Sequence, residues 1–417
     1  MHKSIPAQVF GLYSIMINYQ KIKEDFPILN KEAKGKKFIY FDSACMSLKP
    51  KQVVSAINEY YLEYPACAGR SSHRLGEIVT KKVKEARQIV ASFINAESRE
   101  VIFLRNTTEA INLVANSLNL KEGEIVLTTD KEHNSNLIPW QVLQKRKGVK
   151  HEIIKTGDDG SFDFERYKEQ IKGVKLLSII HTSNFDGVSL PVKEIISIAH
   201  ENGALVLLDV AQSAPHIKID VKDLDVDFLA FSGHKLLGPT GTGVLFGKFK
   251  ELEKLDSFLV GGSTVEYSTY TEHKTVGVPE KFEAGLQDYA GIIGLGEGIK
   301  YLLSIGLDDI REHELILNKY ITEELAKIER IKIIGPADAS LRSGIISFYI
   351  DGVDMHQVGT MLEEMSGIMI RVGQHCVHSW YNDRKIKNSA RISLYFYNTM
   401  AEAQELVSSL NKIIRIL

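Results

Sequence analysis

The feature that most constrains the fold is a series of short apolar runs, separated by amphipathic segments, between residues 37 and 247. Several runs are apolar at both alternating positions, as in ALVLL (204–208) and FLAF (228–231), which is typical of strands covered on both faces. Alternating strands and helices predict a large α/β domain with a mainly parallel sheet. We expect strands at 37–44, 101–105, 124–129, 175–184, 204–212, 226–233 and 242–247, and helices at 81–94, 108–118 and 192–203.

The pattern changes after about residue 290. Helical segments at 290–304, 308–328, 354–365 and 399–416 accompany the apolar runs IKIIG, GIISFYI, MIRVG and ARISLYFYN. This arrangement predicts a smaller α+β domain with an antiparallel sheet. We therefore expect an N-terminal extension (1–23), a large domain (24–289) whose residues 24–36 pack with the small domain, and a small C-terminal domain (290–417).

Composition narrows the class of protein. A formal charge of -2 with scattered Lys and Arg gives no basic footprint for nucleic acid or an anionic membrane. No run reaches the roughly 18 apolar residues of a membrane span, and PAQVFGLYSIMI lacks the features of a signal peptide. Three cysteines without CxxC spacing predict neither a disulfide framework nor a metal site, so a cytoplasmic location fits best. Met16 is an alternative start to Met1.

Polar residues follow the apolar runs where ligands bind in parallel sheets. GPTGTG (238–243) is not a P-loop, because no Lys-Ser/Thr follows and VLFG resembles a strand. Lys235 follows one strand, and a lysine there is most often a solvated charge. Asp209, however, ends a fully apolar run, where a carboxylate needs a partner. Together they suit pyridoxal phosphate (PLP), with the lysine as Schiff base and the acid on the pyridine nitrogen.

The segment RNTTEAINLVA supplies a helix start for the phosphate. Asn106, Thr107 and Thr108 precede or open the helix, with Glu109 placed as in a capping box. A helix N-terminus offers free N–H groups to an anion. Plain helix capping explains the same residues equally well.

Cys376, in RVGQHCVHSW (371–380), has two interpretations when it is taken alone. A free cysteine is often buried and inert, but a thiol beside cationic or hydrogen-bonding groups such as Arg371 and His375 is a candidate nucleophile.

The motifs, taken in order, resemble one family. They are YFDSA, RNTTEAINLVANSL, EHNSNLIPWQ, HTSN, DVAQSAPHIKIDVKDLDVDFLAFSGHK with GPTGTGVLFGK, KFEAG, RVGQHC and ARISLYFYN. From about residue 24 to the C-terminus the chain resembles class V PLP enzymes of the cysteine desulfurase and selenocysteine lyase family, SufS-like group. The resemblance implies PLP fold-type I, which is aspartate-aminotransferase-like.

The resemblance also implies a role for each residue that matches a motif. Lys235 would bind PLP covalently and act as base, and Cys376 would accept sulfur as a persulfide. Asp209 would contact the pyridinium, His133 would lie on the ring face, and Gln212 would contact the phenolic oxygen. The phosphate would be bound by Thr107, Thr108, Ser232 and His234. The substrate would be bound by Asn184, Arg391 and Arg371.

Four segments depart from the family pattern. FEAGLQ has Leu286 where a threonine would reach the phosphate across a dimer interface, so that contact is not carried over. Cys45 stands in the small-residue run after the first strand, HCVHSW lacks the usual proline, and PACAGRSSH brings Gly69 and Cys67. Cys45 and Cys67 are either packing residues or partners of Cys376 in sulfur relay or metal binding.

The expected activity is that of a homodimeric cysteine desulfurase. It would convert L-cysteine to L-alanine and pass the sulfur, through a persulfide, to an acceptor protein for iron–sulfur cluster or thio-cofactor assembly. The alternatives are a selenocysteine lyase or cysteine-sulfinate desulfinase on the same scaffold, a more distant epimerase or kynureninase-like hydrolase, or a non-enzymatic sulfur-transfer scaffold.

Overall fold

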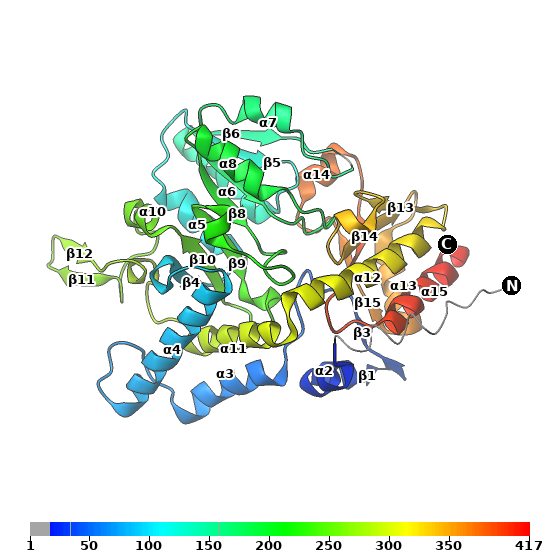
Figure 1. The fold of residues 1–417 in the computed structure, drawn as a ribbon, viewed down its shortest axis with the longest axis horizontal. Helices are drawn as coiled ribbons and strands as arrows, with labels where there is room; N and C mark the ends of the chain where they lie inside the picture. The colour runs from blue at the N-terminus through cyan, green and yellow to red at the C-terminus, as the bar shows by residue number, and fades with distance from the viewer. Residues whose placement is uncertain (1–16, 34, 158) are drawn as a thin grey trace.

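A mixed sheet forms the centre of the computed structural model, which describes residues 17–33, 35–157 and 159–417 (Figure 1). Its strands run in the order β4-β10-β9-β8-β7-β5-β6, and only β10 pairs antiparallel with its neighbours. The expected mainly parallel sheet is confirmed. The strands are β4 (Val101–Leu104), β5 (Ile125–Thr129), β6 (Lys150–Ile154), β7 (Val174–Ile180), β8 (Leu205–Asp209), β9 (Phe228–Ser232) and β10 (Gly243–Gly247).

Both faces of this sheet are covered, and the covering follows the strand period of two. In β8, Val206 and Leu208 belong to one buried cluster, whereas Leu207 belongs to the cluster on the other face. This alternation explains the apolar runs. The surrounding helices are α3 (Lys51–Glu63), α4 (Arg74–Phe93), α5 (Thr107–Ser117), α6 (Ile138–Lys147), α7 (Phe164–Gln170), α8 (Val192–Glu201) and α11 (Tyr289–Ile305).

A second, antiparallel sheet lies in the C-terminal part, in the order β13-β14-β17-β16. Its strands are β13 (Ile331–Ile334), β14 (Ile345–Ile350), β16 (Arg371–Gly373) and β17 (Ser389–Ser393). Helices α12 (Leu307–Ala326), α13 (Met355–Ser366) and α15 (Met400–Ile416) pack against it around a separate apolar cluster (Figure 1). The expected α+β arrangement is therefore present, while the domain boundaries remain a prediction.

Two expected strands are different in the structure. The run at 37–44 forms only the short β3 (Ile39–Tyr40), which pairs in parallel with β15 (Ile368–Met369) outside the large sheet. The run MIRVG (369–373) is split, because Met369 pairs with Tyr40 whereas Arg371 pairs with Arg391 of β17. A single apolar run thus serves two neighbours, which strand periodicity alone cannot reveal.

The N-terminal helix α2 (Tyr19–Asp25) crosses the expected boundary at residue 23. The choice between Met1 and Met16 as the start lies outside the described residues. Among the residues described, no single helix is both long and apolar enough to cross a membrane, although the bent pair α11 and α12, at 72°, passes that test together.

Parallel pairing brings the carboxyl ends of β7, β8 and β9 to one edge of the large sheet. The N-terminus of α5 reaches the same edge beside β10, where Gly243 lies against the backbone of Asn106. A Cβ at Gly243 would stand only 2.5 Å from the Asn106 Cα, so this close approach requires glycine. The fold therefore gathers the polar residues that follow these strands.

Candidate active site

One cavity of about 310 Å³ lies at this edge and is also lined by residues from the antiparallel sheet. Every residue that the sequence assigned to the site lines it, although the motifs stand far apart in the chain. They are Thr107, Thr108, His133, Asn184, Asp209, Gln212, Ser232, His234, Lys235, Arg371, Cys376 and Arg391. The structure thus brings these residues together in one cavity, and their individual roles stay predictions.

Lys235 and Asp209 form the base of the cavity. Lys235 ends the short 3₁₀ turn Gly233–Lys235 that follows β9, and its ammonium has no hydrogen-bond or ion-pair partner within the described part of the chain. Burial lowers its pKa, and the Asp209 charge opposes that shift. Asp209 is 6% exposed, accepts only the Ala211 N–H at 2.9 Å, and has a pKa raised by burial. Among the described residues, the half-buried amine thus has no hydrogen-bond or ion-pair partner, and the buried carboxylate has no ion-pair partner.

Hydroxyl groups and a helix N-terminus form one end of the cavity. The Ser232 Oγ accepts the Thr107 N–H at 2.9 Å and lies 2.7 Å from the Thr107 Oγ1, while the Thr108 Oγ1 lies 2.7 Å from the Ser135 Oγ. Asn106 caps the helix by accepting the Glu109 N–H at 2.9 Å. The expected helix start is thus in place, and its free N–H groups favour an anion.

Two neutral histidines flank this end. Burial, with the nearby Lys235 and Arg391 charges, lowers the pKa of His133 to about 3. Burial similarly lowers the pKa of His234 to about 4. Gln212 donates its Nε2 to the Ala44 carbonyl at 2.7 Å, and its Oε1 remains unpartnered. These side chains offer a flat neutral ring and a free amide oxygen to a planar polar ligand.

Arg391 is the buried cation on the opposite side. It is 3% exposed, donates its Nη1 to the Asn184 carbonyl at 2.8 Å, and lies 3.3 Å from Asp42 through Nη2. Its Nε has no partner among the described residues. A buried guanidinium with an unused N–H is suited to hold a carboxylate.

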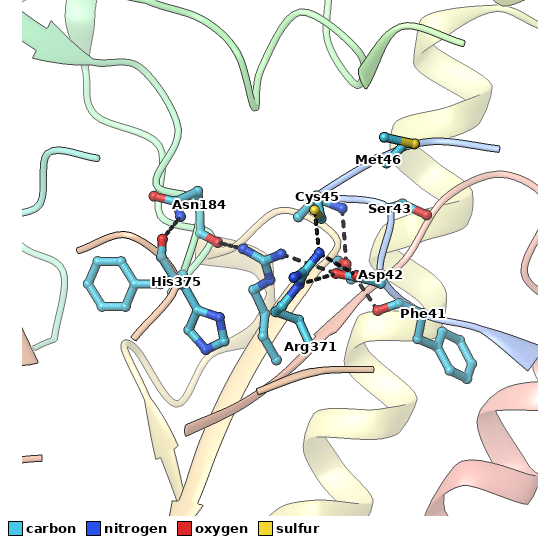
Figure 2. A network of polar contacts seen from close by, with 12 residues as sticks. Phe41, Asp42, Ser43, Cys45, Met46, Asn184, Arg371 and His375 are labelled. Carbon is cyan, nitrogen blue, oxygen red and sulfur yellow. Dashed lines mark hydrogen bonds and ion pairs between the residues drawn. The ribbon is translucent and has the colours of Figure 1, made fainter. Parts of the chain in front are cut away.

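Asp42 joins Arg391 to a second arginine, Arg371, which Figure 2 shows beside Asp42 and Cys45. Arg371 lies 3.0 Å from the Asp42 carboxylate, and its Nη2 also donates to the sulfur of Cys45. The sequence did not single out Asp42 as a site residue. The signal available was YFDSA, the first of the matched motifs, but its aspartate meets these arginines only through tertiary packing.

Cys376 is exposed and sits in a tight loop in which both His375 and Cys376 have positive φ, at 50° and 59°. The backbone of this loop is held from the other side of the cavity. The Asn134 N–H donates to the Cys376 carbonyl and the Asn184 Nδ2 donates to the His375 carbonyl, both at 2.7 Å. The thiol is thus presented to the cavity by a loop with a fixed backbone.

Residues 39–406 match the model of the family described as aminotransferase class-V. The chain belongs to the aminotransferase class-V family. Proteins named as probable cysteine desulfurases are 41% identical in Halalkalibacterium halodurans and 40% identical in Pyrococcus abyssi, each over 95% of this chain and 98% of the relative.

Solved structures agree with this placement. An apo cysteine desulfurase from Thermococcus onnurineus has a TM-score of 0.91 at 39% identity, covering 95% of this chain and 98% of its own. The cysteine desulfurase CsdA from Escherichia coli has a TM-score of 0.88 at 30% identity, covering 96% and 99%. This aminotransferase class-V chain is thus a homologue of cysteine desulfurases, in a PLP-dependent family.

One expectation about the class-V site needs correction. His375 and Arg371 were candidates to favour the Cys376 thiolate. His375 is 8% exposed, lies 2.9 Å from the Ser389 Oγ, and has a pKa lowered well below its usual value by burial, so it is neutral. The Arg371 guanidinium contacts Cys45 and Asp42 instead. His375 therefore brings no positive charge to Cys376, whereas help from Arg371, or from a hydrogen bond of His375, stays a prediction.

The positions that depart from the family pattern fall into different environments. Leu286 is 68% exposed, and Gln287 donates to the Ala284 carbonyl at 3.0 Å. Trp380 is buried on Phe185, with ring centroids 4.6 Å apart, and so anchors the segment after Cys376. Cys67 packs in an apolar cluster with tyrosines of α3 and α11, whereas Cys45 lines the cavity.

Proposed function

We propose that the protein is a PLP-dependent cysteine desulfurase that converts L-cysteine to L-alanine and carries the released sulfur on Cys376. The observation that carries this proposal is one cavity lined by Lys235, which has no hydrogen-bond or ion-pair partner among the described residues, by the buried Asp209 and Arg391, and by the free thiol of Cys376. The relatives named as cysteine desulfurases support it.

The residues present fit PLP. Lys235 would hold it covalently, Asp209 would pair with the pyridine nitrogen, and the N-terminus of α5 would take the phosphate. The fit is chemical as well as spatial. A buried carboxylate without a cationic partner and an amine without an anionic partner each destabilise the fold unless a bound ligand supplies that partner. The remaining contacts would come from His133, Gln212, Thr107, Thr108, Ser232 and His234.

When bound, PLP draws electrons from the substrate amino acid and so weakens its Cα–H and Cβ–S bonds. Arg391 and Asn184 hold the cysteine carboxylate, and Arg391 exchanges part of its contact with Asp42 for the substrate. Lys235, with a pKa lowered by burial, takes the proton from Cα. The neutral His133 covers the site without adding charge.

Cys376 then accepts the sulfur. Its thiolate attacks the substrate sulfur, so that an S–S bond forms on Cys376 while the Cβ–S bond breaks. The electron pair of that bond remains with the carbon skeleton, which takes up one proton at Cβ, regains the Cα proton from Lys235 and leaves as alanine. The exposure of Cys376 suits onward transfer to an acceptor protein.

The sulfur acceptor and the oligomer are the finer parts of this proposal. We expect a carrier or scaffold protein for iron–sulfur cluster or thio-cofactor assembly in the cytoplasm. We also expect a homodimer, because apolar side chains are exposed on α3 and on nearby loops, including Tyr61, Leu62, Val260 and Leu286. Sedimentation measurements on the purified protein test the dimer.

The test is an assay of alanine and sulfide from cysteine with a thiol reductant, for the wild type and Cys376→Ser. We expect the variant to lose at least about 100-fold in cysteine turnover, since the nucleophile is removed. PLP absorbance should be retained. Normal alanine and persulfide formation by the variant would contradict the role of Cys376.

Selenocysteine in the same assay separates the rival lyase. If selenocysteine is turned over faster than cysteine, and equally fast by Cys376→Ser, the protein is a selenocysteine lyase. A purified protein that neither absorbs as a PLP enzyme nor responds to added PLP would instead be a non-enzymatic scaffold.

A further inference from the structure

A second thiol shares the cavity with Cys376. Cys45 is half-buried, follows the short strand β3, and lines the same cavity of about 310 Å³ as Cys376 and Lys235. Both thiols are close enough to Lys235 to raise its pKa, against the larger lowering that burial causes. The two sulfurs therefore face one small space from opposite segments of the chain.

Cys45 has the contact that Cys376 lacks. Its sulfur accepts a hydrogen bond from the Nη2 of Arg371, which Asp42 holds in place through contacts of 3.0 and 3.3 Å (Figure 2). Within the described residues, the Cys376 sulfur has no hydrogen-bond partner. A cationic donor favours the thiolate, which is the nucleophilic form of cysteine.

Two reactions of the pair make different demands on the backbone. A disulfide needs Cα atoms about 4.4–6.8 Å apart and would have to move the backbone wherever they lie further apart. The Cys376 loop is tied by the two hydrogen bonds from Asn134 and Asn184, which oppose such a movement. Transfer of the outer persulfide sulfur requires less movement of the backbone, because that atom extends about 2 Å beyond the Cys376 sulfur.

We propose that Cys45 is a second sulfur-carrying thiol, which takes the outer sulfur from the Cys376 persulfide. This inference rests on the proposed function. The Cys45 thiolate attacks the outer sulfur, a new S–S bond forms on Cys45, and the S–S bond on Cys376 breaks. The electron pair leaves with the Cys376 sulfur as thiolate, and the proton stays on the transferred sulfur. No oxidant or reductant is consumed.

The transfer frees Cys376 for another turnover before any acceptor arrives. Each protomer can then carry two sulfane sulfurs, one on the exposed Cys376 and one on the half-buried Cys45. Arg371 would donate a hydrogen bond to the negatively charged sulfur held on Cys45.

The experiment uses the full-length PLP-loaded protein, a small excess of cysteine and no added thiol. Sulfane sulfur is counted by cyanolysis, alanine is measured in parallel, and mass spectrometry of peptides locates each added sulfur. The variants are Cys45→Ala and the similarly sized Cys45→Ser, with Cys67→Ala as the matched control. Thermal midpoints and PLP absorbance show which variants fold.

We expect two sulfane sulfurs per protomer in the wild type and in Cys67→Ala, on Cys45 and Cys376. The count should fall to one, on Cys376, in whichever Cys45 variant folds. A single sulfur on Cys376 in the wild type, two sulfurs in series on Cys376, or a Cys45–Cys376 disulfide would overturn the inference. Absence of alanine from every protein would refute the proposed function instead.

Discussion

The two sides of the active-site cavity are built in different ways. The side that we call the cofactor wall consists of Thr107, Asp209, Gln212, Ser232 and Lys235, which lie at or just beyond strand ends of the large sheet or at the α5 N-terminus. The side that we call the sulfur wall consists of Cys45, Arg371, Cys376 and Arg391, together with Asp42, which pairs with both arginines.

Chain separation is the main difference between these walls. Neighbouring parallel strands bring the cofactor wall together, because each strand ends at the same edge of the sheet. The sulfur wall instead depends on contacts between residues more than 300 positions apart, such as Asp42 with Arg371 and Cys45 with Arg371. The residues of the cofactor wall are therefore brought together by the large sheet itself. Those of the sulfur wall meet only when the C-terminal part packs against that sheet.

The largest loss of cysteine turnover is expected from a substitution in the cofactor wall. Lys235→Ala would remove both the proposed covalent link to PLP and the proposed base, so cysteine turnover should fall by about 10³-fold or more. Alanine formation measures the turnover, and absorbance measures the bound PLP. Lys193→Ala is the control, because Lys193 is an exposed partner of Asp223. Turnover within tenfold of the wild type would contradict the role of Lys235.

A substitution in the sulfur wall is expected to cause a smaller loss of activity, which acts mainly on the binding of cysteine. Arg391→Lys loses the planar, two-pronged donor, and a hydrogen bond to a charged group contributes about 1.5–3 kcal/mol, so the KM for cysteine should rise about 10- to 100-fold. The kcat should change less. Cysteamine, which has no carboxylate, supplies the control. If the variant loses activity equally on cysteine and cysteamine, Arg391 acts on the fold rather than on the carboxylate.

The lowered pKa of the half-buried His133, which also lines the cavity, predicts a pH dependence of stability. The pKa of His133 is about 3 in the folded protein and about 6.5 when unfolded. Between these values the unfolded chain binds more protons, so stability is lost as pH falls below about 6.5. We expect a lower thermal midpoint at pH 5.5 than at pH 7.5, with a smaller difference in His133→Gln.

His273→Gln serves as the control for that measurement, because His273 lies exposed on the strand β12 (His273–Thr275). An equal loss of pH dependence in both variants would mean that burial of His133 is not its cause.

The smallest effect is expected outside both walls. Cys67 packs among tyrosines and does not line the cavity. Cys67→Ala should leave cysteine turnover unchanged and lower the free energy of unfolding by about 1 kcal/mol, which is typical of a modest packing loss. Turnover and chemical denaturation measure the two quantities. A clear loss of turnover would place a third thiol in the sulfur chemistry.

Much of the cofactor wall could be predicted from sequence because its signals are local. An apolar run that ends in Asp209, a strand followed at once by Lys235, and a capped helix start at Asn106 each carry their meaning within a few residues. Parallel topology then leaves little freedom in where those residues meet.

The sulfur wall could be predicted only in part. The motif with Cys376 was visible, but its sequence did not reveal that burial keeps the His375 ring neutral and places its Nε2 beside the Ser389 Oγ. Splitting of the run MIRVG between two partners directs Arg371 toward Asp42 and Cys45. No local pattern encodes that choice, since it depends on which segments are adjacent in space.

The sequence by itself determined the α/β class, the parallel sheet and the identity of the chemical groups, because strand period, capping and buried charge act over short distances. The tertiary structure decided which groups share the cavity, which arginine meets which sulfur, and which histidines remain neutral. Those properties arise from burial and from contacts between distant segments. The position of Cys45 beside Arg371, rather than among packing residues like Cys67, is the clearest instance.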